Sequence, residues 1–75
     1  MKELVEFMAR SLVDQPEAVM VDEEWHGDRV VFHLGVAEAD KGKVIGKQGR
    51  VAGAMRTLIK VAAVRDGVRV NLDID

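Results

Sequence analysis

The sequence predicts a small α+β domain in which a three-stranded sheet carries helices on one face. Three observations support this class. Apolar residues recur at helical spacing near the N-terminus and again after residue 50, they alternate at strand spacing in three short segments, and glycine or proline separates these segments. The expected order is α-β-β-α-α-β, and one layer of helices on one sheet face would bury every apolar stripe. All 75 residues are expected to form a single domain, residues 1–75.

The first element is an amphipathic helix over residues 2–14. It should end before Pro16, because proline pushes the preceding residue out of the α region. Glu6 and Arg10 are four residues apart, in the favourable order for a surface ion pair. Its expected buried stripe consists of Met1, Leu4, Val5, Met8, Leu12 and, at the margin, Ala9.

Two strands should follow, over residues 19–26 and 29–36. The two residues between them, Gly27-Asp28, fit a hairpin turn because glycine readily adopts positive φ. Alternation is clear in the second strand and weaker in the first. Trp25 shares the parity of the apolar residues of the first strand, so we expect it in the core, with a hydrophobic contact surface as the alternative.

A short helical turn is predicted to run to about Val44, with Glu38 or Asp40 as its cap. A long helix should then cover residues 50–66 and end at Gly67, which suits the position after a helix C-terminus. The expected buried stripe of this helix consists of Val51, Met55, Leu58, Ile59 and Ala62, with Ala54 and Ala63 beside it.

The chain should close with a strand over residues 68–74. Val68, Val70, Leu72 and Ile74 alternate there with polar residues. This pattern predicts one buried and one solvated face.

Charge is distributed unevenly along the chain. Residues 1–40 carry ten acids and three bases, whereas residues 41–65 carry seven bases and no acid. Two interpretations remain open at this point. The charges either keep a small protein soluble or form a basic binding face on a chain that otherwise repels polyanions.

The basic segment contains two glycines three residues apart, Gly46 and Gly49, which enclose Lys47 and Gln48. Glycine lacks Cβ, so a sugar–phosphate backbone can approach the main chain closely. The helix that begins at Arg50 adds free N–H groups and the positive end of a dipole. Gly53, one turn later, either lets a base or a partner backbone approach or serves close helix packing.

Other chemistries find little support. The spacing from Gly42 to Gly46 is one residue too short for a P-loop, and Gln48 stands where a hydroxyl should bind magnesium. The two histidines lack neighbouring ligands at metal spacing, and no nucleophile–base pair is evident. We therefore expect no enzyme activity, no cofactor and no metal. The absence of cysteine and of apolar runs longer than four residues predicts a cytoplasmic protein with no membrane segment.

The segment from Val44 to Arg50 resembles the signature loop of KH domains, and the whole chain resembles the small bacterial single-KH proteins of the KhpA (YlqC) family. Residues 12–16, 42–50 and 55–58 carry the match, while Lys41 stands where the family more often has an apolar residue. The resemblance implies a type II KH domain that binds single-stranded RNA. The implied RNA-binding residues are Lys43, Ile45, Gly46, Lys47, Gln48, Gly49 and Arg50.

The resemblance also implies protein partners and a cellular role. Members are expected to form a homodimer, or a heterodimer with a larger KH-containing protein of the KhpB/Jag type, and to act as RNA chaperones that affect cell-wall synthesis and cell shape. A second hypothesis follows, in which the domain mainly dimerises or docks on a larger RNA binder. Salt dependence separates the two, because phosphate contacts release counterions and weaken as salt rises.

Overall fold

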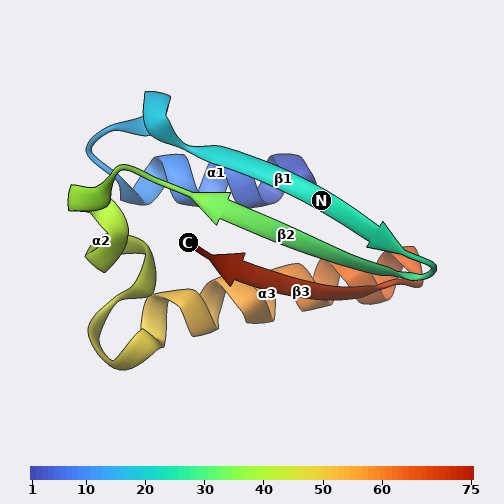
Figure 1. Ribbon diagram of the computed structural model, residues 1–75. Coiled ribbons are helices and arrows are strands. Elements are labelled where there is room, and N and C mark those ends of the chain that lie inside the picture. Colours follow the sequence, from blue (N-terminus) through green and yellow to red (C-terminus); the bar gives the residue numbers. More distant parts are fainter.

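A computed structural model describes residues 1–75 and confirms the α+β order predicted from the sequence (Figure 1). A 3₁₀ turn precedes each of β1, α2 and α3. The elements are α1 (Lys2–Leu12), η1 (Pro16–Ala18), β1 (Met20–His26), β2 (Arg29–Gly35), η2 (Glu38–Asp40), α2 (Lys41–Ile45), η3 (Lys47–Gly49), α3 (Arg50–Asp66) and β3 (Arg69–Ile74).

The strands form one mixed sheet in the order β1-β2-β3. β1 and β2 form the expected antiparallel hairpin, with His26 opposite Arg29 and positive φ at Gly27. β3 runs parallel to β2, which pairs Phe32 with Leu72. Both long helices lie on the same side of this sheet, so one sheet face is covered and the other is open (Figure 1).

The core fills the space between the sheet and the two long helices. Alternate residues of β2, namely Val30, Phe32 and Leu34, are completely buried there. They pack with Val5 and Ala9 of α1. The remaining members of the core cluster are Val19, Val21, Met55, Ile59, Ala63, Val70 and Leu72. No helix is long and apolar enough to cross a membrane.

Helix α1 ends two residues earlier than predicted. Val13 is already extended, at φ −99° and ψ 159°. The backbone N–H groups of Asp14 and Gln15 donate to the carboxylate of Asp40 instead of continuing the helix. The predicted pair of Glu6 and Arg10 does form, at 3.8 Å.

Three predicted core residues are exposed instead. Leu12, the last residue of α1, is 39% exposed. Trp25 faces the helix side of the sheet, but it lies near the tip of the hairpin and is 49% exposed. Leu58 is 55% exposed, because the buried stripe of α3 runs through Ala52, Met55, Ile59 and Ala63. The stripe is thus rotated relative to the predicted one, and Leu58 lies beside α1 at the surface.

Candidate nucleic-acid interface

The glycine loop joins α2 to α3 through three unusual backbone conformations. Gly46 has φ 74° and ψ 173°, Gln48 has φ 58°, and Gly49 is left-handed with φ 72°. The N–H of Gly46 closes α2 on the carbonyl of Gly42 at 2.8 Å, and the N–H of Gly49 closes the next turn on Gly46 at 3.2 Å. The chain therefore leaves one helix, turns tightly and enters the next within four residues.

Gly46 owes its identity to Val51 in the first turn of α3. A Cβ at position 46 would lie 2.4 Å from Cγ2 of Val51 and 3.0 Å from its backbone nitrogen. No other glycine of the loop is so restricted, since a Cβ at Gly42 or Gly49 would have nothing within 4 Å. Direct contact between Gly46 and α3 thus fixes the angle of the loop.

The side chains predicted to contact RNA surround this loop. Lys47, Gln48 and Arg50 are exposed, and neither basic residue forms an ion pair within the chain. Ile45 ends α2 with 41% of its surface exposed. Gly49 has no side chain to cap α3, and the N–H of Arg50 donates to the backbone carbonyl of Lys47.

Asp40 is the functional candidate that sequence reasoning missed. It is 1% exposed and it caps no helix with its side chain, contrary to expectation. Its two oxygens accept the backbone N–H groups of Asp14 at 3.3 Å and Gln15 at 3.1 Å. Burial alone would raise the pKa of Asp40, but these N–H donors and the Lys43 ammonium outweigh it and lower the pKa below its ordinary value.

Lys43 lies on the same network rather than in the loop. Its ammonium donates to Asp14 and lies 3.4 Å from Asp40, and these carboxylates raise the pKa of Lys43 despite its partial burial. Asp40 and Lys43 together tie the segment after α1 to α2. The predicted contact of Lys43 with RNA stays a prediction, and its charge is already shared with two carboxylates.

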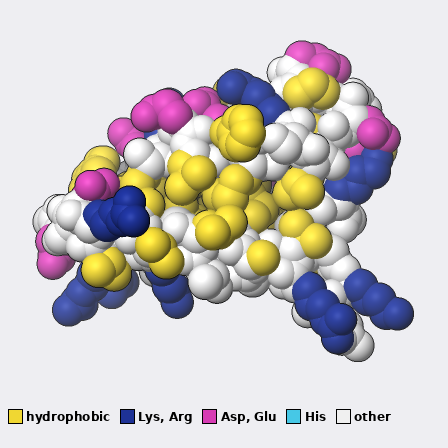
Figure 2. Space-filling model, turned by 180° about the vertical axis from the view of Figure 1, so that it is seen from behind, with side chains coloured by type: hydrophobic (Ala, Val, Ile, Leu, Met, Phe, Trp, Pro, Cys, Tyr) yellow, Lys and Arg dark blue, Asp and Glu magenta, His cyan; other side chains and the backbone are white.

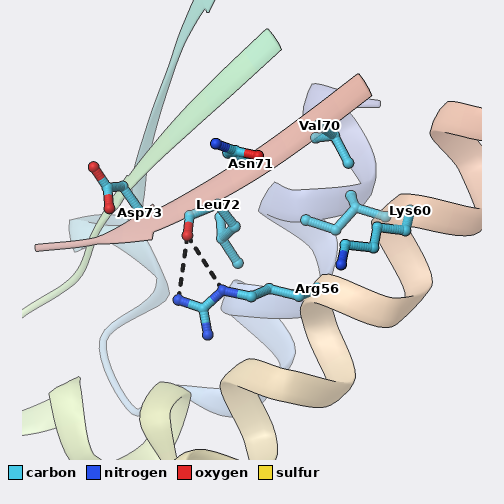
Figure 3. Close-up of a pocket in the computed structure, with 7 residues that line it drawn as sticks. Arg56, Lys60, Val70, Asn71, Leu72 and Asp73 are labelled. Atoms are coloured by element: carbon cyan, nitrogen blue, oxygen red, sulfur yellow. Dashed lines mark hydrogen bonds between the residues drawn. The ribbon is translucent and has the colours of Figure 1, made fainter. Parts of the chain in front are cut away.

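A groove of about 300 Å³ lies between α3 and the free edge of β3 (Figure 3). Arg56 spans it, with Nε and Nη2 both donating to the backbone carbonyl of Leu72 at 3.3 and 3.2 Å. The other residues that line it are Ile59, Lys60, Val70, Asn71 and Asp73.

One exposed row of α3 connects the loop to this groove. Gly49, Gly53, Arg56 and Lys60 follow one another at steps of four, three and four residues, so they lie on one helix face. A Cβ at Gly53 would meet nothing within 4 Å, which excludes close helix packing as the reason for this glycine. The row therefore forms an open track that leads from the loop to the groove.

The helix side of the molecule carries a second surface, which we call the apolar helix face. Phe7, Leu12, Leu58 and Val61 are between 39% and 69% exposed there. Phe7 and Leu58 border a hollow between α1 and α3, whose lining is otherwise Met8, Ser11, Leu12, Val51, Ala54 and Met55. Figure 2 shows apolar side chains gathered across this side, with Lys and Arg projecting along the lower edge, where α3 and the loop lie.

The open sheet face carries a chain of ionisable groups. Glu24 lies 3.2 Å from His33 and 3.4 Å from His26, and Asp73 lies 3.7 Å from the other ring nitrogen of His33. The hydrogen bond with Glu24 raises the pKa of His33, and the same bond lowers the pKa of Glu24. No group of three side chains is arranged to hold a metal ion.

Comparison with known proteins identifies a family and relatives that match this chain. A family model described as "KhpA/KhpB, KH domain" matches residues 2–74. The chain is 50% identical over 74 residues to the RNA-binding protein KhpA of Clostridium perfringens, covering 99% of each chain. It is 43% identical to the protein of the same name from Chlamydia trachomatis, covering 99% of this chain and 95% of the other.

Solved structures agree on the fold. A crystal structure of Era from Aquifex aeolicus superposes with a TM-score of 0.61 at 20% identity, covering 97% of this chain and 28% of the Era chain. A structure of Era in complex with nucleotides of 16S ribosomal RNA superposes with a TM-score of 0.60. The family match spans nearly the whole chain and the relatives match end to end. The chain therefore belongs to the KhpA/KhpB family of KH domains.

Proposed function

We propose that the chain binds single-stranded RNA through a helix–GXXG–helix clamp formed by α2, residues 46–49 and α3. The observation that carries the proposal is the loop itself, where the exposed Lys47 and Arg50, which form no ion pair within the chain, flank the positive-φ residues Gln48 and Gly49 at the start of α3. KH loops of this kind hold the backbone of about four nucleotides. The relatives from Clostridium perfringens and Chlamydia trachomatis are named RNA-binding proteins, which supports this function.

Each predicted residue has a role in this clamp. Gly49, where a Cβ would have open space, lets the phosphates approach the main chain, Gly46 lets the turn pack against Val51, and Lys47 and Arg50 supply charge. Gln48, whose side chain is exposed and whose backbone has positive φ, offers an amide to the RNA backbone. Ile45 offers an apolar surface for a sugar or a base. Lys43 holds α2 in place through Asp14 and Asp40 and contacts RNA from the edge of the loop.

The exposed row of α3 extends this site. Arg56 lies six residues after Arg50, which is about 9 Å along the helix axis. A strand held at the loop would therefore reach the groove at Arg56 within one or two nucleotides. Gly53 has no side chain that projects from α3 between the loop and Arg56, so the bases can lie against the helix.

The clamp is tested by replacing Lys47 and Gln48 together by aspartate. Both side chains are exposed, so the fold should survive, whereas two negative charges should repel phosphate. Fluorescence anisotropy with a random single-stranded RNA, at low and high salt, should show salt-sensitive binding by the wild type and none by the variant. The matched control replaces Glu38, an exposed residue outside the loop, by glutamine. Unchanged affinity in the Lys47→Asp/Gln48→Asp variant would refute the clamp.

The wider role follows the family resemblance. We infer a cytoplasmic protein that acts as an RNA chaperone and post-transcriptional regulator, with effects on cell-wall synthesis and cell shape. A strand-annealing assay with complementary labelled RNAs tests the chaperone activity. Acceleration by the wild type, and its loss in the Lys47→Asp/Gln48→Asp variant, is the expected result.

We propose as a second function that the apolar helix face associates with another copy of the chain. Phe7 and Leu58, which are 69% and 55% exposed, favour this because monomers rarely expose contiguous large apolar patches without a role. A heterodimer with a larger KhpB/Jag-type protein is the other outcome that we consider. The apolar helix face is a different surface from the row of Gly49, Gly53, Arg56 and Lys60, so the protein can associate and bind RNA at the same time.

Association is tested with Leu58→Glu, which places a charge at the centre of the face. Analytical ultracentrifugation should show a dimer that the variant converts to monomer. Val64, which is 78% exposed, provides the control through Val64→Glu. A wild-type protein that stays monomeric at high concentration would exclude the homodimer and direct the search to the larger partner.

A further inference from the structure

We propose that a hollow beside the C-terminal half of α3 holds RNA beyond the nucleotides that the clamp holds. This inference rests on the proposed RNA binding, and it assigns a minimum length to the ligand. KH clamps hold about four nucleotides, so a hollow for one or two more would make the ligand a single strand of about six or more.

The hollow, which we call the distal hollow, has a volume of about 260 Å³ and continues the groove that Arg56 spans. It shares Lys60 and Val70 with that groove, and both lie at the end of the groove opposite Asp73 (Figure 3). The rest of its lining consists of Ala63, Val64, Val68 and Arg69. α3 and β3 thus border one channel, which leads from the loop past Arg56 to the distal hollow.

Two cations border the distal hollow without a partner of their own. Lys60 and Arg69 are exposed, and neither forms an ion pair within the chain. Asp66, the acid nearest to both in the sequence, does not line the hollow. Asp28 accepts the N–H of Arg69 with its backbone carbonyl at 2.8 Å and does not line it either. The distal hollow therefore presents positive charge, which fits a phosphate.

The surface between these cations is apolar. Val64 is 78% exposed, the largest fraction among the exposed large apolar side chains, and Val68 is half-buried. A single exposed valine on a protein surface is ordinary. This one lies in a depression beside two unpaired cations, on the channel that begins at the loop. An apolar patch flanked by positive charge suits a nucleotide, because the face of a base is apolar and its phosphate is negative.

The end of α3 limits where the phosphate can lie. A helix C-terminus carries the negative end of the dipole, which repels anions over the last turn. Two of its carbonyls are already occupied, because Val64 accepts the N–H of Gly67 at 3.2 Å and Ala63 accepts that of Val68 at 3.0 Å. We therefore place the phosphate at the two cations and the base against Val64 and Val68.

The test measures fluorescence anisotropy with uridine tetramers and octamers, for the wild type and for Val64→Ser/Arg69→Gln. The tetramer occupies the clamp alone, so both proteins should bind it equally. The octamer reaches the distal hollow, so the variant should bind it about tenfold more weakly, because an apolar contact and a phosphate contact are lost. The salt dependence of octamer binding should also become less steep, by about 0.7 for one phosphate contact.

Met20→Ser/Arg29→Gln is the matched control. It also removes one exposed apolar side chain and one exposed arginine, and both positions lie on the first two strands, outside the channel. Its affinity for the octamer should equal that of the wild type. Melting temperatures show whether the variants are folded. Amide signals in NMR spectra of the wild type locate the contact independently, since the octamer and not the tetramer should shift those of residues 64–69.

The outcomes separate the distal hollow from the clamp. Equal octamer binding by the wild type and Val64→Ser/Arg69→Gln, or unshifted signals of residues 64–69, would overturn the hollow and leave the clamp intact. Tetramer and octamer binding that weaken by the same factor would also overturn it. Octamer binding that survives Lys47→Asp/Gln48→Asp would refute the clamp instead. Failure of the wild type to bind either RNA at low salt would refute both.

Discussion

Replacing Gly46 by alanine should destabilise the domain more than any other glycine substitution in the loop. The backbone at φ 74° and ψ 173° lies in a region that is essentially restricted to glycine, which costs another residue about 1–3 kcal/mol. The new Cβ would also lie 2.4 Å from Cγ2 of Val51, and such overpacking costs a further ~1–3 kcal/mol. A total of about 2–6 kcal/mol is a large part of the stability that a domain of this size has.

Thermal unfolding followed by far-ultraviolet circular dichroism measures this loss. At about 4–8 °C per kcal/mol, the melting temperature should fall by at least about 8 °C. Gly49→Ala is the matched control, because Gly49 also has positive φ but open space around it, and it should cost only ~1–2 kcal/mol. Gly42→Ala should instead stabilise the helical turn by up to about 1 kcal/mol.

A double variant tests whether Val51 is the cause. Val51→Ala removes the nearest atom, so Gly46→Ala should cost less in that background, with a coupling of about 1 kcal/mol or more. If Gly46→Ala and Gly49→Ala melt at the same temperature, or if Val51→Ala brings no relief, then contact with α3 does not determine the identity of Gly46.

Three further substitutions test other parts of the structure. Asp40→Asn should lower the melting temperature at neutral pH, and this difference should shrink as the pH falls through the lowered pKa of Asp40, where the wild-type carboxylate is lost too. His33→Gln should lower the melting temperature most between pH 4.5 and pH 6.5, the ordinary pKa values of Glu24 and His33, where both groups of the pair are charged. This loss should vanish as the pH rises through the raised pKa of His33. A difference in melting temperature that stays constant across a pH series would contradict this. Gly53→Ala should stabilise α3 by up to about 1 kcal/mol yet weaken RNA binding, and unchanged anisotropy titrations would show that RNA does not approach there.

Local patterns were sufficient to predict most of the fold. The alternation of Val30, Phe32 and Leu34 identified a strand, and these three residues are completely buried. The helix from Arg50 to Asp66 has the predicted ends, because a glycine precedes it and Gly67 follows it. Periodicity and glycine act over a few residues, so a single sequence contains the information.

The errors arose where distant segments meet. The orientation of α3 depends on where α1 packs, and this decided that Leu58 is exposed while Ala52 is buried. Trp25 has the parity of a core residue, but no helix covers the tip of the hairpin completely. The spacing of apolar residues within one strand or helix does not show how far the neighbouring helix covers it.

The candidate site was predictable only in its loop. Asp40 is 25 and 26 residues away from the N–H groups that it accepts, and Arg56 is 16 residues away from the carbonyl of Leu72. Neither hydrogen bond can be predicted from residue type, because the sequence does not distinguish Asp40 from other acidic residues or Arg56 from the other arginines of the basic segment. The basic residues along α3 could be recognised in the sequence from their charge. The groove between α3 and β3 could be found only from the three-dimensional structure.

The loop that we propose as an RNA clamp is held from two sides in the free protein. Asp40 and Lys43 fix α2 against the segment after α1, and Gly46 fixes the loop against Val51. A loop that is ordered in the free protein loses little conformational freedom on binding, so more of the phosphate contact energy appears as affinity. The Asp40→Asn variant should therefore weaken RNA binding even though Asp40 is buried. Its binding curve should shift while its salt dependence, which counts the phosphate contacts, stays the same.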